Sequence, residues 1–214
     1  MISLRGLRFA YARGPTLTFA DVDVPQGGVL LVQGASGSGK STLLALLAGL
    51  LSPAAGRVCV ADTDIAALPS SRRDAWRGRS LGFMPQRLHL SENLNVAGNL
   101  ALPFVCAGAP VDTASVNDVV SRLHIAELTH RKPHELSLGQ AQRVALARAL
   151  VRKPAVIVAD EPTANLDDAN AHGVVSLLRE LSALSRATLV LATHDTRVAS
   201  QVEPTVTVSL EALA

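Results

Sequence analysis

Short apolar runs alternate with longer helical patterns along most of the chain. Continuous apolar runs rich in β-branched residues predict strands that are buried on both faces, as in a parallel sheet. Such runs lie at residues 29–32, 155–159 and 188–193, and weaker strand patterns lie at 58–60, 81–84 and 206–210. Strands separated by helices predict right-handed crossovers, so this pattern favours an α/β fold with a mostly parallel sheet.

The first part of the chain has a different pattern. Residues 2–9 alternate loosely between apolar and polar positions, and residues 17–24 do the same before the turn at residues 25–28. This alternation predicts two strands of an antiparallel sheet. An N-terminal antiparallel β subdomain is therefore expected before the parallel sheet.

Helical patterns follow several of the strands. They cover residues 43–50, 70–79, 94–105, 113–123, 137–152 and 170–184. The helix at 70–79 carries four arginines around Trp76, which is typical of a solvated face or of a surface that touches RNA or lipid. Residues 86–145 are largely helical in pattern. We therefore predict one domain over residues 1–214, in which 86–145 form a helical insertion in a core made of 1–85 and 146–214.

Composition narrows the function classes. The chain has 214 residues, of which 48% are apolar and 18% are charged, as in an ordinary globular protein. Its net charge is only +2 and its aromatic content is 3%. Because nucleic-acid surfaces are basic and stack bases on aromatic rings, we expect no nucleic acid as a partner.

The cysteines and the apolar runs indicate the compartment. Cys59 and Cys106 are too few for a disulfide framework, and their apolar neighbours predict buried free thiols. The start of the chain lacks the pattern of a signal peptide, and no apolar run approaches the roughly 20 residues that span a bilayer. We therefore expect a cytoplasmic protein whose membrane role, if it has one, depends on a partner.

The stretch GASGSGKST carries the first clear chemistry. It fits the pattern G-x-x-x-x-G-K-[ST] and lies between a predicted strand and a predicted helix, where backbone N–H groups point at phosphate oxygens. Lys40 would reach the β- and γ-phosphates, and the Ser41 hydroxyl would bind Mg²⁺. The residues expected to bind the nucleotide here are Gly34, Ala35, Ser36, Gly37, Ser38, Gly39, Lys40, Ser41 and Thr42.

Polar residues at strand ends complete the candidate chemistry. Asp160 follows a buried strand and is the natural carboxylate beside a metal ion, and Glu161 could orient and polarise a water molecule. Gln86 could bind the metal or its water through its amide oxygen, although a structural role is equally compatible with its position. His194 could contact a γ-phosphate, although a histidine at a strand end commonly has a structural role. These residues fall at the carboxyl ends of strands, where ligands of parallel sheets bind.

These motifs together resemble the nucleotide-binding domains of ATP-binding cassette (ABC) proteins over nearly the whole chain. GASGSGKST resembles Walker A, and VIVADE resembles Walker B followed by the catalytic glutamate. LSLGQ resembles the family signature LSGGQ, and the following AQRVALARAL extends the match. Gln86, Asp167 and His194 match the Q-loop glutamine, the D-loop aspartate and the switch histidine. Tyr11 matches the aromatic residue that stacks on adenine.

The resemblance implies a P-loop NTPase (RecA-like) core that uses ATP and Mg²⁺. It implies catalytic roles for Glu161, His194 and Gln86, with Ser41, Gln86 and Asp160 around the metal. It also implies a head-to-tail homodimer, in which the signature of one chain faces the Walker motifs of the other. The signature residues are Ser137, Leu138, Gly139 and Gln140.

One signature position departs from the family pattern. Leu138 stands where the family has glycine, so it adds bulk near the nucleotide and cannot adopt positive φ cheaply. If Leu138 is helical and points away from the nucleotide, little is lost. If phosphates of the partner approach it closely, dimer closure or turnover would be weakened.

Within the family, ADEPTANLD resembles the subgroup of macrolide exporters, lipoprotein-release ATPases and cell-division ATPases, as do LGFMPQ and NLALPF. This resemblance implies an ATPase subunit that powers a separate integral membrane permease of export or mechanotransmission type, peripheral on the inner face of the cell membrane. Alternatives are a soluble ABC ATPase of DNA repair or translation, a P-loop kinase and a poorly hydrolysing regulatory module. A kinase would leave the signature, Asp167 and His194 unexplained, and repair ATPases need long coiled-coil arms that this chain has no room for.

Overall fold

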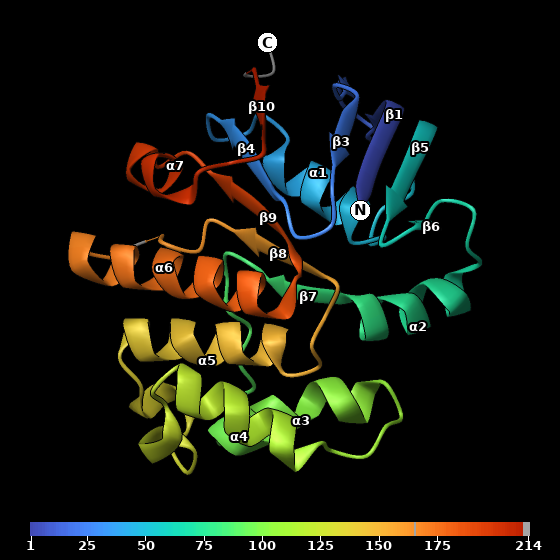
Figure 1. Cartoon of the computed structure of the whole chain (residues 1–214). Helices are drawn as coiled ribbons and strands as arrows, with labels where there is room; N and C mark the ends of the chain where they lie inside the picture. The colour runs from blue at the N-terminus through green and yellow to red at the C-terminus, as the bar shows by residue number, and fades with distance from the viewer. Residues whose placement is uncertain (165, 212–214) are drawn as a thin grey trace.

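The computed structural model describes residues 1–164 and 166–211, apart from the side chains of residues 196 and 197. A parallel sheet lies at its centre (Figure 1). In spatial order its strands are β10 (Val206–Leu210), β4 (Val29–Gly34), β9 (Thr188–Thr193), β8 (Val156–Asp160) and β7 (Leu81–Met84). All neighbouring pairs are parallel, as in the register Leu31 to Leu191. The predicted strands at 29–32, 81–84, 155–159, 188–193 and 206–210 are confirmed in this sheet, whereas the predicted strand at 58–60 belongs to the antiparallel sheet.

Both faces of the parallel sheet are covered, which explains its continuous apolar strands. In β4, Leu31 belongs to an apolar cluster with α5 (Leu138–Leu150) and α6 (Asp168–Ser185). Its neighbours Leu30 and Val32 belong to a second cluster with α1 (Lys40–Leu47) and the antiparallel sheet. Complete burial of such a side chain contributes about 1.5–3 kcal/mol, so the two clusters hold the sheet between its layers.

The antiparallel sheet packs beyond α1 (Figure 1). Its strands are β1 (Ile2–Ala10), β2 (Thr16–Thr18), β3 (Val22–Val24), β5 (Ala55–Val60) and β6 (Thr63–Asp64). The prediction of one strand over 17–24 was wrong, because β2 and β3 pair with opposite ends of β1. Between them, the Gly6 N–H donates to the Asp21 carboxylate, and Gly6 has φ +54. β1 leaves regular pairing at Gly6, and its partner strand is split there.

The remaining helices lie mainly on the side of α5. They are α2 (Ser70–Ser80), α3 (Val96–Cys106), α4 (Thr113–Arg122) and α7 (Thr196–Val202), with short 3-10 turns at Ala126–Leu128 and Pro133–Glu135. The predicted helices are confirmed, whereas α7, β6 and the 3-10 turns were not predicted. Ser137 caps α5, because its hydroxyl accepts from the Gln140 N–H and the Gln140 amide oxygen accepts from the Ser137 N–H.

The proposed insertion boundary at residue 145 falls inside α5. This helix packs against α3 of the insertion and also against β7 and α6. α5 therefore connects the parallel sheet with α3 and α4, which together are called the helical layer below. The division into core and insertion stays a prediction.

The two cysteines are more exposed than the sequence predicted. Cys106 is exposed at the end of α3 and Cys59 is partly buried in β5, so the prediction of two buried thiols was wrong. The last turn of α3 faces outward, since its Val105 is also exposed. Within the described residues, no helix is both long enough and apolar enough to cross a membrane.

Candidate nucleotide-binding site

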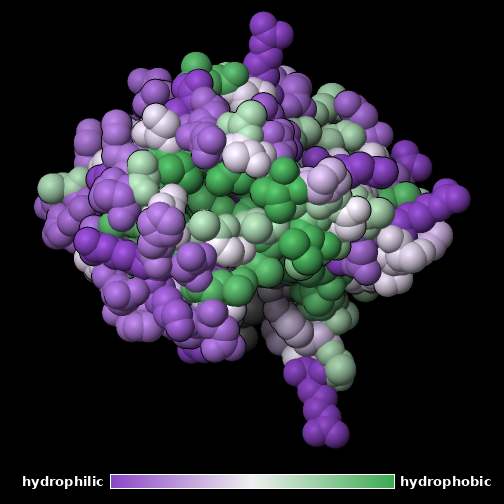
Figure 2. Space-filling model, turned by 90° about the horizontal axis from the view of Figure 1, so that it is seen from below, coloured by the Kyte–Doolittle hydropathy of each residue, from purple (hydrophilic) through white to green (hydrophobic). Residues whose placement is uncertain are grey.

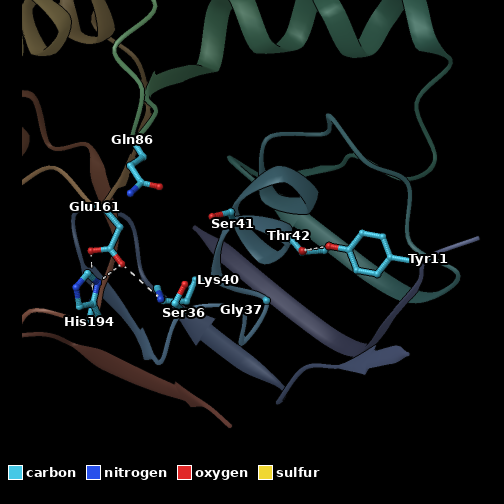
Figure 3. A pocket seen from close by; sticks show the side chains of 10 residues that line it. Tyr11, Ser36, Gly37, Lys40, Ser41, Thr42, Gln86, Glu161 and His194 are labelled. Atoms are coloured by element: carbon cyan, nitrogen blue, oxygen red, sulfur yellow. Dashed lines mark hydrogen bonds and ion pairs between the residues drawn. The ribbon is translucent and has the colours of Figure 1, made fainter. Parts of the chain in front are cut away.

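The carboxyl ends of β4, β9, β8 and β7 lie next to one another at one edge of the sheet. The chain after these four strands carries the phosphate loop, His194, Glu161 and Gln86, in that order. A hollow of about 240 Å³ at this edge is lined by Tyr11, Ser36, Gly37, Gly39, Lys40, Ser41, Thr42, Gln86, Glu161 and His194 (Figure 3). The tertiary structure thus brings together most of the residues predicted to bind and hydrolyse ATP.

Two glycines permit the shape of the phosphate loop. A Cβ on Gly34 would lie 2.5 Å from the Ser38 Oγ and 2.6 Å from the Leu210 carbonyl oxygen, so no larger residue fits there. Gly39 precedes α1 with φ +95, a conformation that favours glycine. The helix that follows offers free backbone N–H groups at its N-terminus, as a phosphate site requires.

Lys40 is the buried cation of the hollow, with 7% of its surface exposed. Its Nζ donates to the Gly34 carbonyl at 2.8 Å and to the Ala35 carbonyl at 3.1 Å. The same Nζ lies 3.4 Å from the Glu161 Oε1. Lys40 therefore already stands between the loop and the candidate base.

Glu161 is held from several sides at the end of β8. His194 Nδ1 lies 2.8 Å from its Oε1, and the Thr193 hydroxyl donates to its Oε2 at 3.0 Å. The backbone of Glu161 has φ +46, which costs about 1–2 kcal/mol for a residue other than glycine. Its N–H nevertheless bonds the Ala192 carbonyl at 2.8 Å. The surrounding contacts therefore orient this carboxylate despite an unfavourable backbone conformation.

Asp160 lies beside Glu161 and is 7% exposed. Its Oδ1 is buried and has no hydrogen-bond partner among the described residues. Burial raises the pKa of this carboxyl, and the nearby Glu161 adds to the rise, whereas the Ser41 hydroxyl and Lys40 oppose it. A buried carboxylate with an unused oxygen is suited to a cation that would satisfy it.

We expect Asp160→Asn to raise the Tm of the nucleotide-free protein by about 2–4 °C at neutral pH, which corresponds to about 1 kcal/mol. The folded state favours the neutral carboxyl, so ionisation of Asp160 costs stability as pH rises through its raised pKa. The gain from asparagine should shrink as pH falls toward the ordinary pKa, where wild-type Asp160 is also neutral. Thermal unfolding of both proteins across pH measures this, and an unchanged or lower Tm at neutral pH would contradict it.

Tyr11 lies at the outer end of the hollow and is 44% exposed. Its hydroxyl hydrogen-bonds the Thr42 hydroxyl, as the dashed line in Figure 3 marks. Its ring meets that of Phe9 edge-on, with the centroids 4.9 Å apart. These contacts orient the ring beside the phosphate loop, while its stacking on adenine stays a prediction.

The predicted signature lies at a second hollow, which shares no lining residue with the first. Its volume is about 420 Å³, and its lining residues are Ser137, Leu138, Gly139, Gln140, Arg143, Leu166, Asp167 and Asn170. Asp167 caps α6 by accepting from the Asn170 N–H at 2.9 Å, and this lowers the Asp167 pKa. Asn165 of the same motif lies outside the described residues. One chain thus carries the phosphate loop and the signature at separate hollows.

Leu138 is the first residue of α5 and has no positive φ, so its backbone is unstrained. Its side chain is 45% exposed and lines the second hollow rather than pointing away from it. The concern about backbone conformation is thereby removed, whereas the concern about bulk remains.

Sequence reasoning missed two polar residues that contact the predicted motifs. Thr193 donates to Glu161, and its only sequence signal is a polar residue at the end of an apolar strand. Gln142 is buried in α5, and its amide donates to the Ala164 carbonyl at 3.4 Å, next to the D-loop. A polar residue within a predicted helix gave no indication of this partner.

Comparison with known proteins identifies the family. The family model for ABC transporters matches residues 17–164. The chain belongs to the ABC transporter family. The resemblance inferred from Walker A, the signature and the D-loop is confirmed.

Two relatives resemble this ABC chain over almost all of its length. The lipoprotein-releasing system ATP-binding protein LolD of Xanthomonas oryzae pv. oryzae is 41% identical over 95% of the chain and 86% of the relative. The macrolide export ATP-binding/permease protein MacB of Paracoccus denitrificans is 40% identical over 94% of the chain. The chain spans only 31% of that longer relative. The predicted subgroup of lipoprotein-release and macrolide-export ATPases is therefore confirmed.

A solved structure agrees with the fold. It is a dimeric ATP-binding cassette in a post-hydrolysis state with bound ADP and Pi, and it is 28% identical to this chain. The match covers 100% of this chain and 97% of the other, with a TM-score of 0.87. The predicted P-loop fold, nucleotide binding and ATPase class are confirmed, and this chain is an ABC ATPase.

Proposed function

We propose that this chain binds Mg²⁺–ATP at the first hollow, hydrolyses it with Glu161, and thereby powers an integral membrane permease. The observation that carries the proposal is the position of Glu161, which lies between Lys40 of the phosphate loop and His194. A carboxylate held in this way can orient a water molecule toward a γ-phosphate bound by the loop.

The residues around Asp160 fit a magnesium ion. Asp160 offers a buried oxygen without a partner among the described residues, and it lies next to the Ser41 hydroxyl. Gln86 lines the same hollow and can add its amide oxygen. We propose Ser41, Asp160 and Gln86 as the residues that hold Mg²⁺ or its waters. When bound, Mg²⁺ supplies positive charge to the oxygens of the phosphates.

His194 and Thr193 orient the base. The His194 Nδ1 carries a proton when it donates to Glu161, which leaves Nε2 free to contact the nucleotide. Because the Thr193 hydroxyl holds the other carboxylate oxygen, Glu161 keeps one orientation during proton transfer. Loss of the γ-phosphate would remove the ligand that these side chains face.

A second copy of the chain would complete the site. The phosphate-loop hollow of about 240 Å³ is smaller than the ~300–1,000 Å³ usual for ligand pockets, and the signature lies at a different hollow. We propose a head-to-tail homodimer, in which Ser137 and Gly139 at the N-terminus of α5 donate to the γ-phosphate of the partner. ATP would then stabilise the closed dimer, and hydrolysis would reopen it.

In such a dimer, Leu138 would stand close to the partner's nucleotide. We expect Leu138→Gly to leave the ATPase rate unchanged or to raise it, since glycine removes bulk from a surface that must close on phosphates. Glycine at this first turn also costs about 1 kcal/mol of helix stability, so Tm should fall slightly. Steady-state ATPase assays check this, and a large fall in turnover would mean that leucine is required for closure.

The partner proposed for the ATPase is a separate integral membrane permease of the lipoprotein-release or macrolide-export type. Figure 2 shows apolar residues gathered near the middle of one face and surrounded by hydrophilic ones. In the helical layer, Val105 of α3 and Val111 before α4 are 64% and 44% exposed. Exposed apolar surface of this kind is suited to cover by another protein. The ATPase would then lie on the cytoplasmic face of the membrane, held there by its permease.

The proposal is tested by purification of tagged Glu161→Gln protein from detergent-solubilised membranes of the native host, with and without ATP. Mass spectrometry then identifies the proteins that come with it. A stoichiometric integral membrane protein would support the permease role. A dimer without any membrane protein, or one bound to ribosomes or nucleic acid, would favour a soluble ABC ATPase instead.

A further inference from the structure

The segment that carries Gln86 has no helix or strand of its own. It covers residues 85–95, between the end of β7 and the start of α3. Leu88 and Leu90 pack partly buried against the apolar cluster beneath it, and His89 has φ +47. Side chains of neighbouring helices must therefore hold this segment in place, because the segment lacks a ladder of backbone hydrogen bonds.

Two side chains, one from α3 and one from α5, bind the segment directly. Asn99 of α3 accepts from the Ser91 N–H at 2.8 Å and donates to the Ser91 carbonyl at 3.1 Å. Arg148 of α5 donates to the His89 carbonyl at 2.7 Å and to the Leu88 carbonyl at 2.5 Å. The Arg148 contacts lie only two and three residues beyond Gln86.

Arg148 is partly buried, and no carboxylate among the described residues lies within salt-bridge distance of it. Burial lowers the pKa of its guanidinium, which indicates that its charge is costly to keep there. An arginine held in such a place by two carbonyl groups fixes their positions well, because the planar fork of guanidinium donors is rigid. Arg148 also lies on the helix that begins with the signature, roughly 16 Å along its axis from Ser137.

We propose that Arg148 is a positioning residue that ties the Gln86 segment to α5, so that Gln86 and the signature helix move together. The inference rests on the proposed function, in which Gln86 acts at the metal side of the site. A shift of α5 in either dimer partner would then displace Gln86 through the Leu88 and His89 carbonyls. Turnover would thus depend on the position of the helical layer.

Arg152, two residues beyond the end of α5, provides a matched control. Arg148 and Arg152 both line a hollow of about 920 Å³ between α2, α3 and α5. Like Arg148, Arg152 donates to two backbone carbonyls, those of Gly78 and Pro103. Neither carbonyl belongs to the segment at residues 85–95. Arg148→Met and Arg152→Met therefore remove the same charge and comparable bonds, but only the first releases the Gln86 segment.

The test compares ATPase kinetics, ATP affinity and Tm for Arg148→Met, Arg152→Met, Gln86→Ala and the double variant Gln86→Ala/Arg148→Met. We expect Arg148→Met to lower kcat about 10- to 100-fold, the usual cost of a misplaced catalytic group, with unchanged ATP affinity. Arg152→Met should lower Tm similarly but keep the wild-type kcat. The double variant should be no slower than Gln86→Ala, because Arg148 acts through Gln86.

Two outcomes would overturn the inference while the proposed function stands. Equal losses of kcat in Arg148→Met and Arg152→Met would indicate a general structural role. A further loss in the double variant relative to Gln86→Ala would show that Arg148 acts elsewhere. If Gln86→Ala itself keeps wild-type turnover, the proposed role of Gln86 fails and this inference fails with it. Should Arg148→Met not fold, Arg148→Lys replaces it in the same comparison, because lysine keeps the charge but lacks the two-pronged contact.

Discussion

Replacement of Glu161 by glutamine is expected to slow ATP hydrolysis about 100- to 10,000-fold, the usual contribution of a general base. Glutamine has the same shape, so its amide oxygen can replace the Oε1 that faces His194, and its NH2 group can donate to the Thr193 hydroxyl in place of Oε2. It cannot accept a proton from water, however. ATP binding should persist, and the variant should accumulate as an ATP-bound dimer because reopening requires hydrolysis.

The measurement combines a phosphate-release assay with size-exclusion chromatography in ATP. Glu180→Gln is the matched control, since Glu180 is exposed on α6 and contributes to neither hollow. The control should keep wild-type turnover and the wild-type elution volume. If Glu161→Gln hydrolysed ATP at the wild-type rate, another group would have to orient the water.

Replacement of Lys40 by alanine is expected to lower kcat about 100- to 1,000-fold, as loss of a single charge-stabilising donor does elsewhere, and to weaken ATP binding. Lys40 Nζ stands where the loop would bring phosphates, and its three contacts hold it there. Without it, Glu161 also loses its cation and would repel the phosphates.

Titration with a fluorescent ATP analogue and a parallel ATPase assay separate the two effects. Lys132→Ala is the control, because Lys132 is exposed and its loss changes the net charge by the same amount. Normal ATP affinity together with normal turnover in Lys40→Ala would contradict the assignment of the first hollow as the nucleotide site.

Local patterns were sufficient for the phosphate loop and for the central strands. The loop is a continuous stretch whose glycines, lysine and serine act within nine residues, and its neighbours predict the strand and helix that frame it. The apolar runs that became β8 and β9 are buried on both faces, as their composition predicts. The short helix α7 was missed, since its seven residues carry too little periodicity to distinguish it from a loop.

Other features depend on contacts between distant parts of the chain. The split of residues 17–24 into β2 and β3 follows from the irregularity of β1 at Gly6, and the exposure of Cys106 follows from the outward face of the last turn of α3. For Leu138, one property is evident in the sequence and two others depend on the fold. Its departure from the signature pattern is evident in the sequence, but its ordinary helical backbone and its place on the second hollow are properties of the fold.

The amino-acid sequence by itself determined the nucleotide loop, the α/β class and the family motifs, because each is encoded within a short continuous stretch. Only the tertiary structure decided which residues meet. The strand order β10-β4-β9-β8-β7 brings Lys40, Glu161 and His194 to one edge of the sheet, and helix packing brings Arg148 to the Gln86 segment. These contacts join residues many positions apart, and their geometry is set by strand register and layer packing, which no local pattern of residues specifies.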